Sequence, residues 1–147
     1  MTRRRQPVHD AAEQGDVEKL NQLLKAKPSA ADVADSFGAG PLYYAALQSK
    51  LEAVKVLIEH KATVDRTRDG GSTALHIACM FGHTEVAKFL LDNGAAIDRS
   101  SRIGETALIA AVSSQHLNCV KLLLERKADT RPRIAGGLNR GNSALAF

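Results

Sequence analysis

The chain has little of several residue types that mark common protein classes. Its two cysteines, Cys79 and Cys119, are too few for a disulfide framework and lie in no spacing that binds zinc. Aromatic residues make up 4% and tryptophan is absent, which argues against a stacking platform for single-stranded nucleic acid. No segment approaches the ~18 consecutive apolar residues of a membrane span, and the basic start leads into no apolar signal segment. We therefore expect a cytoplasmic protein, with the nucleus also compatible, that binds neither membranes nor nucleic acid.

Charge is nearly balanced over the 147 residues. Twenty Lys and Arg against 16 Asp and Glu give a formal net charge of +4. The basic residues are scattered, with a local excess of six Lys or Arg over two acids in residues 121–147. The simplest interpretation is solubility, and the same excess is compatible with an acidic or phosphorylated partner.

Internal repeats dominate what is present. Four columns of residues recur every 33 positions: Gly38, Gly71 and Gly104; Leu42, Leu75 and Leu108; Ala45, Ala78 and Ala111; and Leu57, Leu90 and Leu123. Each unit predicts two helices. The second carries an apolar stripe, Leu51, Val54, Leu57 and Ile58 in one unit and Leu117, Val120, Leu123 and Leu124 in another. A two-helix unit cannot bury such a stripe alone, so we expect neighbouring units to stack on it.

Signals for helix ends agree with this division. Thr73 and Thr106 are expected N-caps, and Pro7 and Pro41 suit a first helical turn. Gly94 stands where a left-handed residue commonly ends a helix. Lys61 and Lys127 occupy the same column, so we expect them to adopt that conformation with modest strain.

The unit Gly71-Ser72-Thr73-Ala74-Leu75-His76-Ile77-Ala78, followed by Gly82-His83-Thr84-Glu85-Val86 and Leu90-Leu91-Asp92-Asn93-Gly94-Ala95, resembles the ankyrin repeat family. The resemblance covers residues 6–147 and implies an all-α solenoid. In it, stacked helix-turn-helix units are joined by β-hairpin loops, with about four and a half repeats.

The predicted organisation is a basic tail (1–5), a capping repeat (6–34), repeats at 35–67, 68–100 and 101–131, and an inserted loop with a partial repeat (132–147). The first unit is assigned as a cap because Asp10, Lys19 and Gln22 stand in columns that are mostly apolar later. The last unit stops inside a first helix, which favours a fragment of a longer array. The alternative is a frayed last turn that a partner or another copy covers.

The residues that could carry chemistry have structural interpretations. His76 is expected to hydrogen-bond backbone, His83 and His116 to be solvated or capping, and both cysteines to be buried and inert. Asp65, Asp69, Asp92 and Asp98 are expected to satisfy local backbone donors at turns. We predict no catalytic residue, cofactor or metal site, and therefore no enzyme activity.

What the resemblance implies for function is binding of a protein partner through loop tips and the exposed side of the first helices, as a scaffold or adaptor. The matching positions are Ser36, Phe37, Ala39, Leu47, Gln48, Asp69, Gly70, Ser72, Met80, Phe81, Arg102, Ile103, Glu105, Ser113 and Ser114. The apolar members form an exposed patch, or else Leu47 and Phe81 pack against neighbouring helices. We expect a monomer whose partner has no motif that names it.

Two other functions stay open at this point. The array could target a larger enzyme, such as a ubiquitin ligase or kinase, whose catalytic domain lies beyond Phe147. A self-contained inhibitor of a partner's active site is a more distant alternative, because it requires a complete and stable chain.

Overall fold

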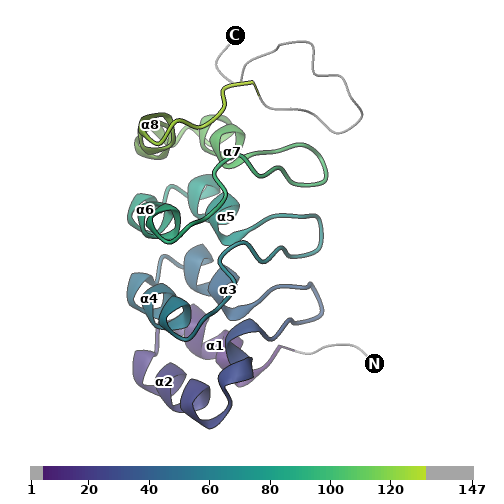
Figure 1. The fold of residues 1–147 in the computed structure, drawn as a ribbon, viewed down its shortest axis with the longest axis vertical. Helices are drawn as coiled ribbons and strands as arrows, with labels where there is room; N and C mark the ends of the chain where they lie inside the picture. The colour runs from purple at the N-terminus through teal and green to yellow at the C-terminus, as the bar shows by residue number, and fades with distance from the viewer. Residues whose placement is uncertain (1–4, 132–147) are drawn as a thin grey trace.

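The computed structural model describes residues 5–131, and they form a stack of helix pairs (Figure 1). One short 3₁₀ helix joins the first pair to the second. The helices are α1 (Pro7–Gln14), α2 (Val17–Ala26), η1 (Pro28–Asp32), α3 (Pro41–Leu47), α4 (Leu51–Glu59), α5 (Ala74–Met80), α6 (Thr84–Asp92), α7 (Ala107–Ser113) and α8 (Leu117–Glu125). The predicted all-α solenoid is confirmed.

The core lies between the helix pairs and runs the length of the stack. The first helices α1, α3, α5 and α7 contact one another in series, and so do the second helices α2, α4, α6 and α8. Leu57, Leu90 and Leu123, which recur every 33 residues, are fully buried. Each unit therefore completes its core with its neighbours, as the repeat pattern predicts.

Local backbone chemistry explains where the helices begin and end. The Thr73 side chain accepts from the His76 N–H, and Thr106 accepts from the Ile109 N–H, so both are N-caps as predicted. Lys61 and Lys127 have φ values of 69° and 64°, which confirms the expected left-handed conformation. A non-glycine residue in this conformation costs about 1–3 kcal/mol and persists because the packed helices on either side determine the turn.

The loops before α3, α5 and α7 project from one side of the stack (Figure 1). We call them the first finger (residues 33–40), the second finger (63–73) and the third finger (96–106). The predicted β-hairpins are wrong in detail, because no strand is assigned anywhere in residues 5–131. Each finger closes with too few paired backbone groups to form a ladder. The closing bonds are Asp35 N–H to Ala39 O, Arg68 N–H to Ser72 O and Ser101 N–H to Glu105 O.

Aspartates join neighbouring repeats, which corrects the expectation that Asp65 and Asp98 satisfy local donors. Asp65 accepts from the Ala96 N–H at 3.0 Å, and Asp98 accepts from the Asp129 N–H at 2.7 Å. Asp32 does the same one unit earlier, accepting from the Thr63 N–H and Oγ1–H. The partner is 31 residues away each time, because stacking places the next repeat's turn closer than the local backbone.

The last described helix departs from the predicted burial. Leu117 is 63% exposed and Leu124 is 38% exposed, although both belong to an expected inward stripe. Thr84 stands one repeat before Leu117 and reaches toward Cys119 of the next unit, so this column faces the following repeat. The predicted inserted loop and partial repeat at 132–147, and most of the basic tail, lie outside the described residues.

The first unit shows the contrast that the columns predict. Asp10, Lys19 and Gln22 are exposed, whereas Tyr44 and Val56 in the matching columns are buried against it. The extra residue of this unit lies in the segment that forms η1. None of the helices in the described residues has the length and apolar character that crossing a membrane requires.

Candidate functional site

The three fingers are bonded to one another as well as closed on themselves. The Asp69 N–H donates to the Phe37 carbonyl at 2.7 Å, and the Arg102 N–H donates to the Gly70 carbonyl at 2.9 Å. The finger tips are therefore held in a row at a defined spacing. Side chains that leave this row are presented by a rigid backbone, which lowers the entropy lost when they bind.

The base of the first finger is built on a buried carboxylate. Asp35 Oδ1 accepts from the Phe37 N–H at 2.8 Å and the Ala39 N–H at 3.1 Å, and Tyr44 Oη donates to Oδ2. Burial alone would raise the pKa of Asp35, but these three hydrogen bonds outweigh it and hold the pKa below its usual range. Burial and the Asp35 hydrogen bond raise the pKa of Tyr44 to about 12. The guanidinium of Arg5 lies 4.4 Å from the centre of the Tyr44 ring and completes the cluster.

Two histidines connect helices to fingers in the same way. His76 Nδ1 accepts from the Thr73 N–H at 3.0 Å, so Nε2 carries the proton and donates to the Glu105 carbonyl at 3.0 Å. His9 repeats the arrangement, with Nδ1 accepting from the Gln6 N–H and Nε2 facing the Val33 carbonyl. The predicted structural role of His76 agrees with this geometry.

We expect the protein to lose stability in mild acid because of His76. Burial lowers the pKa of His76, so the folded state keeps it neutral while the unfolded chain takes up a proton below about pH 6.5. Stability should therefore fall between about pH 7 and pH 5, and His76→Gln should weaken that dependence. Urea unfolding at several pH values measures it. His60→Gln is the control, and an unchanged pH slope in His76→Gln would contradict the assignment.

The join between the second finger and its neighbouring helix uses a different pair. Arg68 Nη1 donates to Tyr43 Oη at 2.8 Å, and the guanidinium lies 5.3 Å from the centre of the Tyr43 ring. Tyr43 stands in the column of His9 and His76, and Arg68 stands in the column of Asp35 and Ser101. Both side chains are half-buried.

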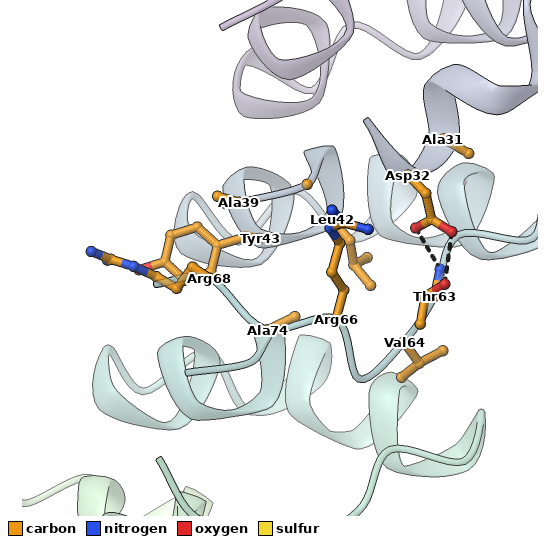
Figure 2. Close-up of a pocket in the computed structure, with 11 residues that line it drawn as sticks. Ala31, Asp32, Ala39, Leu42, Tyr43, Thr63, Val64, Arg66, Arg68 and Ala74 are labelled. Atoms are coloured by element: carbon orange, nitrogen blue, oxygen red, sulfur yellow. Dashed lines mark hydrogen bonds between the residues drawn. The ribbon is translucent and has the colours of Figure 1, made fainter. Parts of the chain in front are cut away.

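A small cavity lies beside this pair, lined by Leu42, Tyr43, Thr63, Arg66 and Arg68 among others (Figure 2). Its volume of about 10 Å³ is room for one water molecule and excludes an organic ligand. Arg66 Nε is buried there without a protein hydrogen-bond partner in the described residues. Figure 2 shows Arg66 turned toward Leu42 while Arg68 extends past Tyr43, so the two guanidinium groups do not converge.

The structure brings most of the predicted binding residues to the fingers and the ends of the inner helices. Nine are exposed: Ser36, Phe37, Gln48, Asp69, Gly70, Phe81, Arg102, Ile103 and Ser113. Five are half-buried: Leu47, Ser72, Met80, Glu105 and Ser114. Ala39 is wrong as a contact residue because it is 1% exposed. Its N–H and carbonyl turn inward to Asp35, so its methyl group joins the core side of the finger.

The apolar members of that set divide into two groups. Phe37 and Ile103 project from finger tips and are 58% and 73% exposed. Phe81 is 50% exposed and stacks on His83, with ring centres 6.3 Å apart. Leu47 and Met80 pack against the core, as the alternative interpretation required for Leu47. The exposed apolar surface is therefore carried by the two tip residues and by Phe81.

Comparison with known families agrees with this architecture. A family model described as ankyrin repeats, in three copies, matches residues 8–101 and 68–134. The chain belongs to the ankyrin repeat family. No curated protein matches the sequence. Ankyrin repeats are a non-catalytic fold that generally mediates protein–protein interaction.

Chemistry elsewhere in the ankyrin array is sparse. Residues 5–131 contain no group of three or more His, Cys, Asp or Glu placed to hold a metal ion. Cys79 and Cys119 are both buried, and the Cys119 hydrogen bond together with burial raises the pKa of the Cys79 thiol. Of the two positions expected for His83, solvated or capping, the structure shows the second: His83 is the N-cap residue of α6, and its Nε2 lies 2.9 Å from the Leu47 carbonyl of the preceding repeat.

Sequence reasoning missed the residues that organise the ankyrin fingers. His9 lies 67 positions before His76, two repeats plus the one extra residue of the first unit, so its column was visible. Arg68 breaks a column that holds Asp35 and Ser101, which was also a visible signal. The pairing of Tyr44 with Asp35 had none, because it depends on how the first finger folds back onto α3 within one repeat.

Proposed function

We propose that this ankyrin array is a scaffold or adaptor that binds a protein partner through its finger tips and the exposed ends of the inner helices. The observation that carries the proposal is the pair of large apolar side chains, Phe37 and Ile103, exposed on hydrogen-bonded tips. Exposed apolar groups on a rigid frame are typical of binding surfaces. The bound partner is a protein segment, and the array itself is a monomer.

The exposed position of these side chains predicts that they affect binding without affecting folding. Phe37→Ser combined with Ile103→Ser should leave the unfolding midpoint nearly unchanged, since neither side chain is part of the core. Affinity for a purified partner should fall about tenfold or more, as expected for central apolar anchors. Isothermal titration calorimetry on the folded variants measures it.

Leu117→Ser is the matched control, because Leu117 is equally apolar and exposed but lies on α8, away from the fingers. It should bind the partner as the unchanged protein does. If the Leu117 variant loses affinity while the tip variant retains it, the binding surface is on the second helices and the proposal is wrong.

A further inference from the structure

The arginines of the described residues divide by position. The three outside the fingers all pair with carboxylates: Arg5 with Asp10 and Glu13, Arg126 with Asp92, and Arg131 with Asp129. The four in the second and third fingers, Arg66, Arg68, Arg99 and Arg102, have no carboxylate within ion-pair distance in that part of the chain. Arg66 lies in the small cavity, whereas Arg68 and Arg102 carry positive charge without an internal partner beside the proposed binding surface.

Arg68 also stands where the other two fingers use a structural residue. Asp35 accepts two N–H groups of its finger, and Ser101 Oγ accepts the Glu105 N–H at 3.2 Å. Arginine has no acceptor, so the second finger lacks this internal bond. A residue that departs in this way from the pattern of its repeat column is expected at a functional site.

Tyr43 departs from its column at the same place. His9 and His76 are buried and bridge to finger carbonyls, whereas Tyr43 is half-buried and its hydroxyl accepts from Arg68. The ring and hydroxyl hold the guanidinium in one orientation, and among residues 5–131 its only side-chain hydrogen bond is the one from Nη1 to the Tyr43 hydroxyl. A planar guanidinium held this way matches the two oxygens of a carboxylate.

We propose that Arg68, positioned by Tyr43, binds a carboxylate of an acidic segment in the partner protein. Arg102 supplies a second positive charge from the third finger. Its backbone N–H donates directly to the Gly70 carbonyl of the second finger. Phe37 and Ile103 contact apolar side chains of the same segment. This inference rests on the proposed function and names the chemistry of its partner.

The acids nearby limit how the segment lies but do not neutralise the site. Asp69 is exposed on the second finger and Glu105 is half-buried on the third. Asp65 and Asp98 use their carboxylates to accept backbone N–H groups of the next repeat. None of the four lies within ion-pair distance of Arg68 or Arg102.

The test uses a synthetic peptide of alternating glutamate and phenylalanine and a matched peptide with glutamine for glutamate. Binding to the full chain is followed by NMR titration at low salt. The glutamate peptide should shift the backbone signals of Arg68 and Arg102. Arg68→Gln should weaken binding of this peptide about tenfold, as expected for the loss of a charged hydrogen bond. Tyr43→Phe, which keeps the ring, should weaken it less. Arg131→Gln is the control, since it makes the same change in net charge outside the fingers.

Equal loss in Arg68→Gln and Arg131→Gln would show only general attraction and overturn the proposal. So would signals shifting in residues 121–131 instead of the fingers, or equal binding of the glutamine peptide. Tighter binding of a single-stranded oligonucleotide, or of vesicles containing phosphatidylserine, would assign the charge to a different class of partner. Thermal unfolding of each variant separates binding from folding.

The two proposals fail in different ways. If Phe37→Ser with Ile103→Ser abolishes binding of a purified partner while Arg68→Gln leaves it unchanged, the surface is correct and the acidic segment is wrong. If Arg68→Gln weakens binding of the partner while Phe37→Ser with Ile103→Ser does not, charge dominates the affinity and the apolar tips do not carry binding.

Discussion

Replacing Asp35 with alanine is expected to lower the free energy of unfolding by about 3 kcal/mol. The substitution leaves three donors without their acceptor: the Phe37 N–H, the Ala39 N–H and the Tyr44 hydroxyl. Asp35 is 2% exposed, so water does not readily take its place. Urea denaturation measures the change. Asp69→Ala is the control, because Asp69 is exposed one position later in the next finger and should change stability by less than about 0.5 kcal/mol.

The interaction with Tyr44 can be isolated by a double-mutant cycle. Tyr44→Phe should be destabilising in the unchanged protein but close to neutral once Asp35 is alanine, since the hydroxyl then has no partner to lose. Additive effects of the two substitutions would contradict the assigned bond.

The difference in stability between the unchanged protein and the Asp35 variant should also shrink as the pH falls below about 4. A carboxyl group whose pKa is lowered in the folded state contributes stability above the pKa of the unfolded state, and this contribution is lost as the folded group is protonated.

Leu90→Ala is expected to cost about 3 kcal/mol, as large-to-small substitutions in cores do. Leu90 lies on α6, is fully buried and belongs to the column that fills the space between repeats. Because each repeat is stabilised by its neighbours, the loss should weaken coupling between the repeats on either side and broaden the urea transition.

Leu117→Ala tests whether position rather than residue type sets this cost. The same change at a side chain that is 63% exposed should alter stability by less than about 0.5 kcal/mol. A comparable loss at Leu117 would mean that this face of α8 is covered in solution.

Most of the fold could be predicted from the 33-residue repeat period. Helices begin at Pro7 and Pro41 and directly after the N-caps Thr73 and Thr106, as predicted, because capping and the first turn depend on local backbone chemistry. Buried leucines follow their columns because an inward position recurs with each unit. The same reasoning found Phe37 and Ile103, which stand at columns the fold leaves open.

The residues of the candidate site were predicted less completely from the sequence, because the exposure of a side chain depends on which neighbouring residues pack against it. Ala39 was assigned to the binding set by its column, but the carboxylate of Asp35 draws its N–H inward and buries it. Leu117 belongs to an inward stripe by periodicity and is exposed by its place on the last described helix.

The sequence alone determined the 33-residue unit, its two helices, their caps and the ankyrin family. Each of these depends on residues close together in the chain or on their regular recurrence. Only the tertiary structure decided that Asp65 and Asp98 bond the following repeat, that Tyr44 meets Asp35, and that Arg68 is held on Tyr43 without a carboxylate. The contacts of Asp65, Asp98 and Arg68 join neighbouring units, so they depend on the exact offset between repeats, which no single repeat encodes. The contact of Tyr44 with Asp35 depends on how the first finger folds onto α3 within one unit.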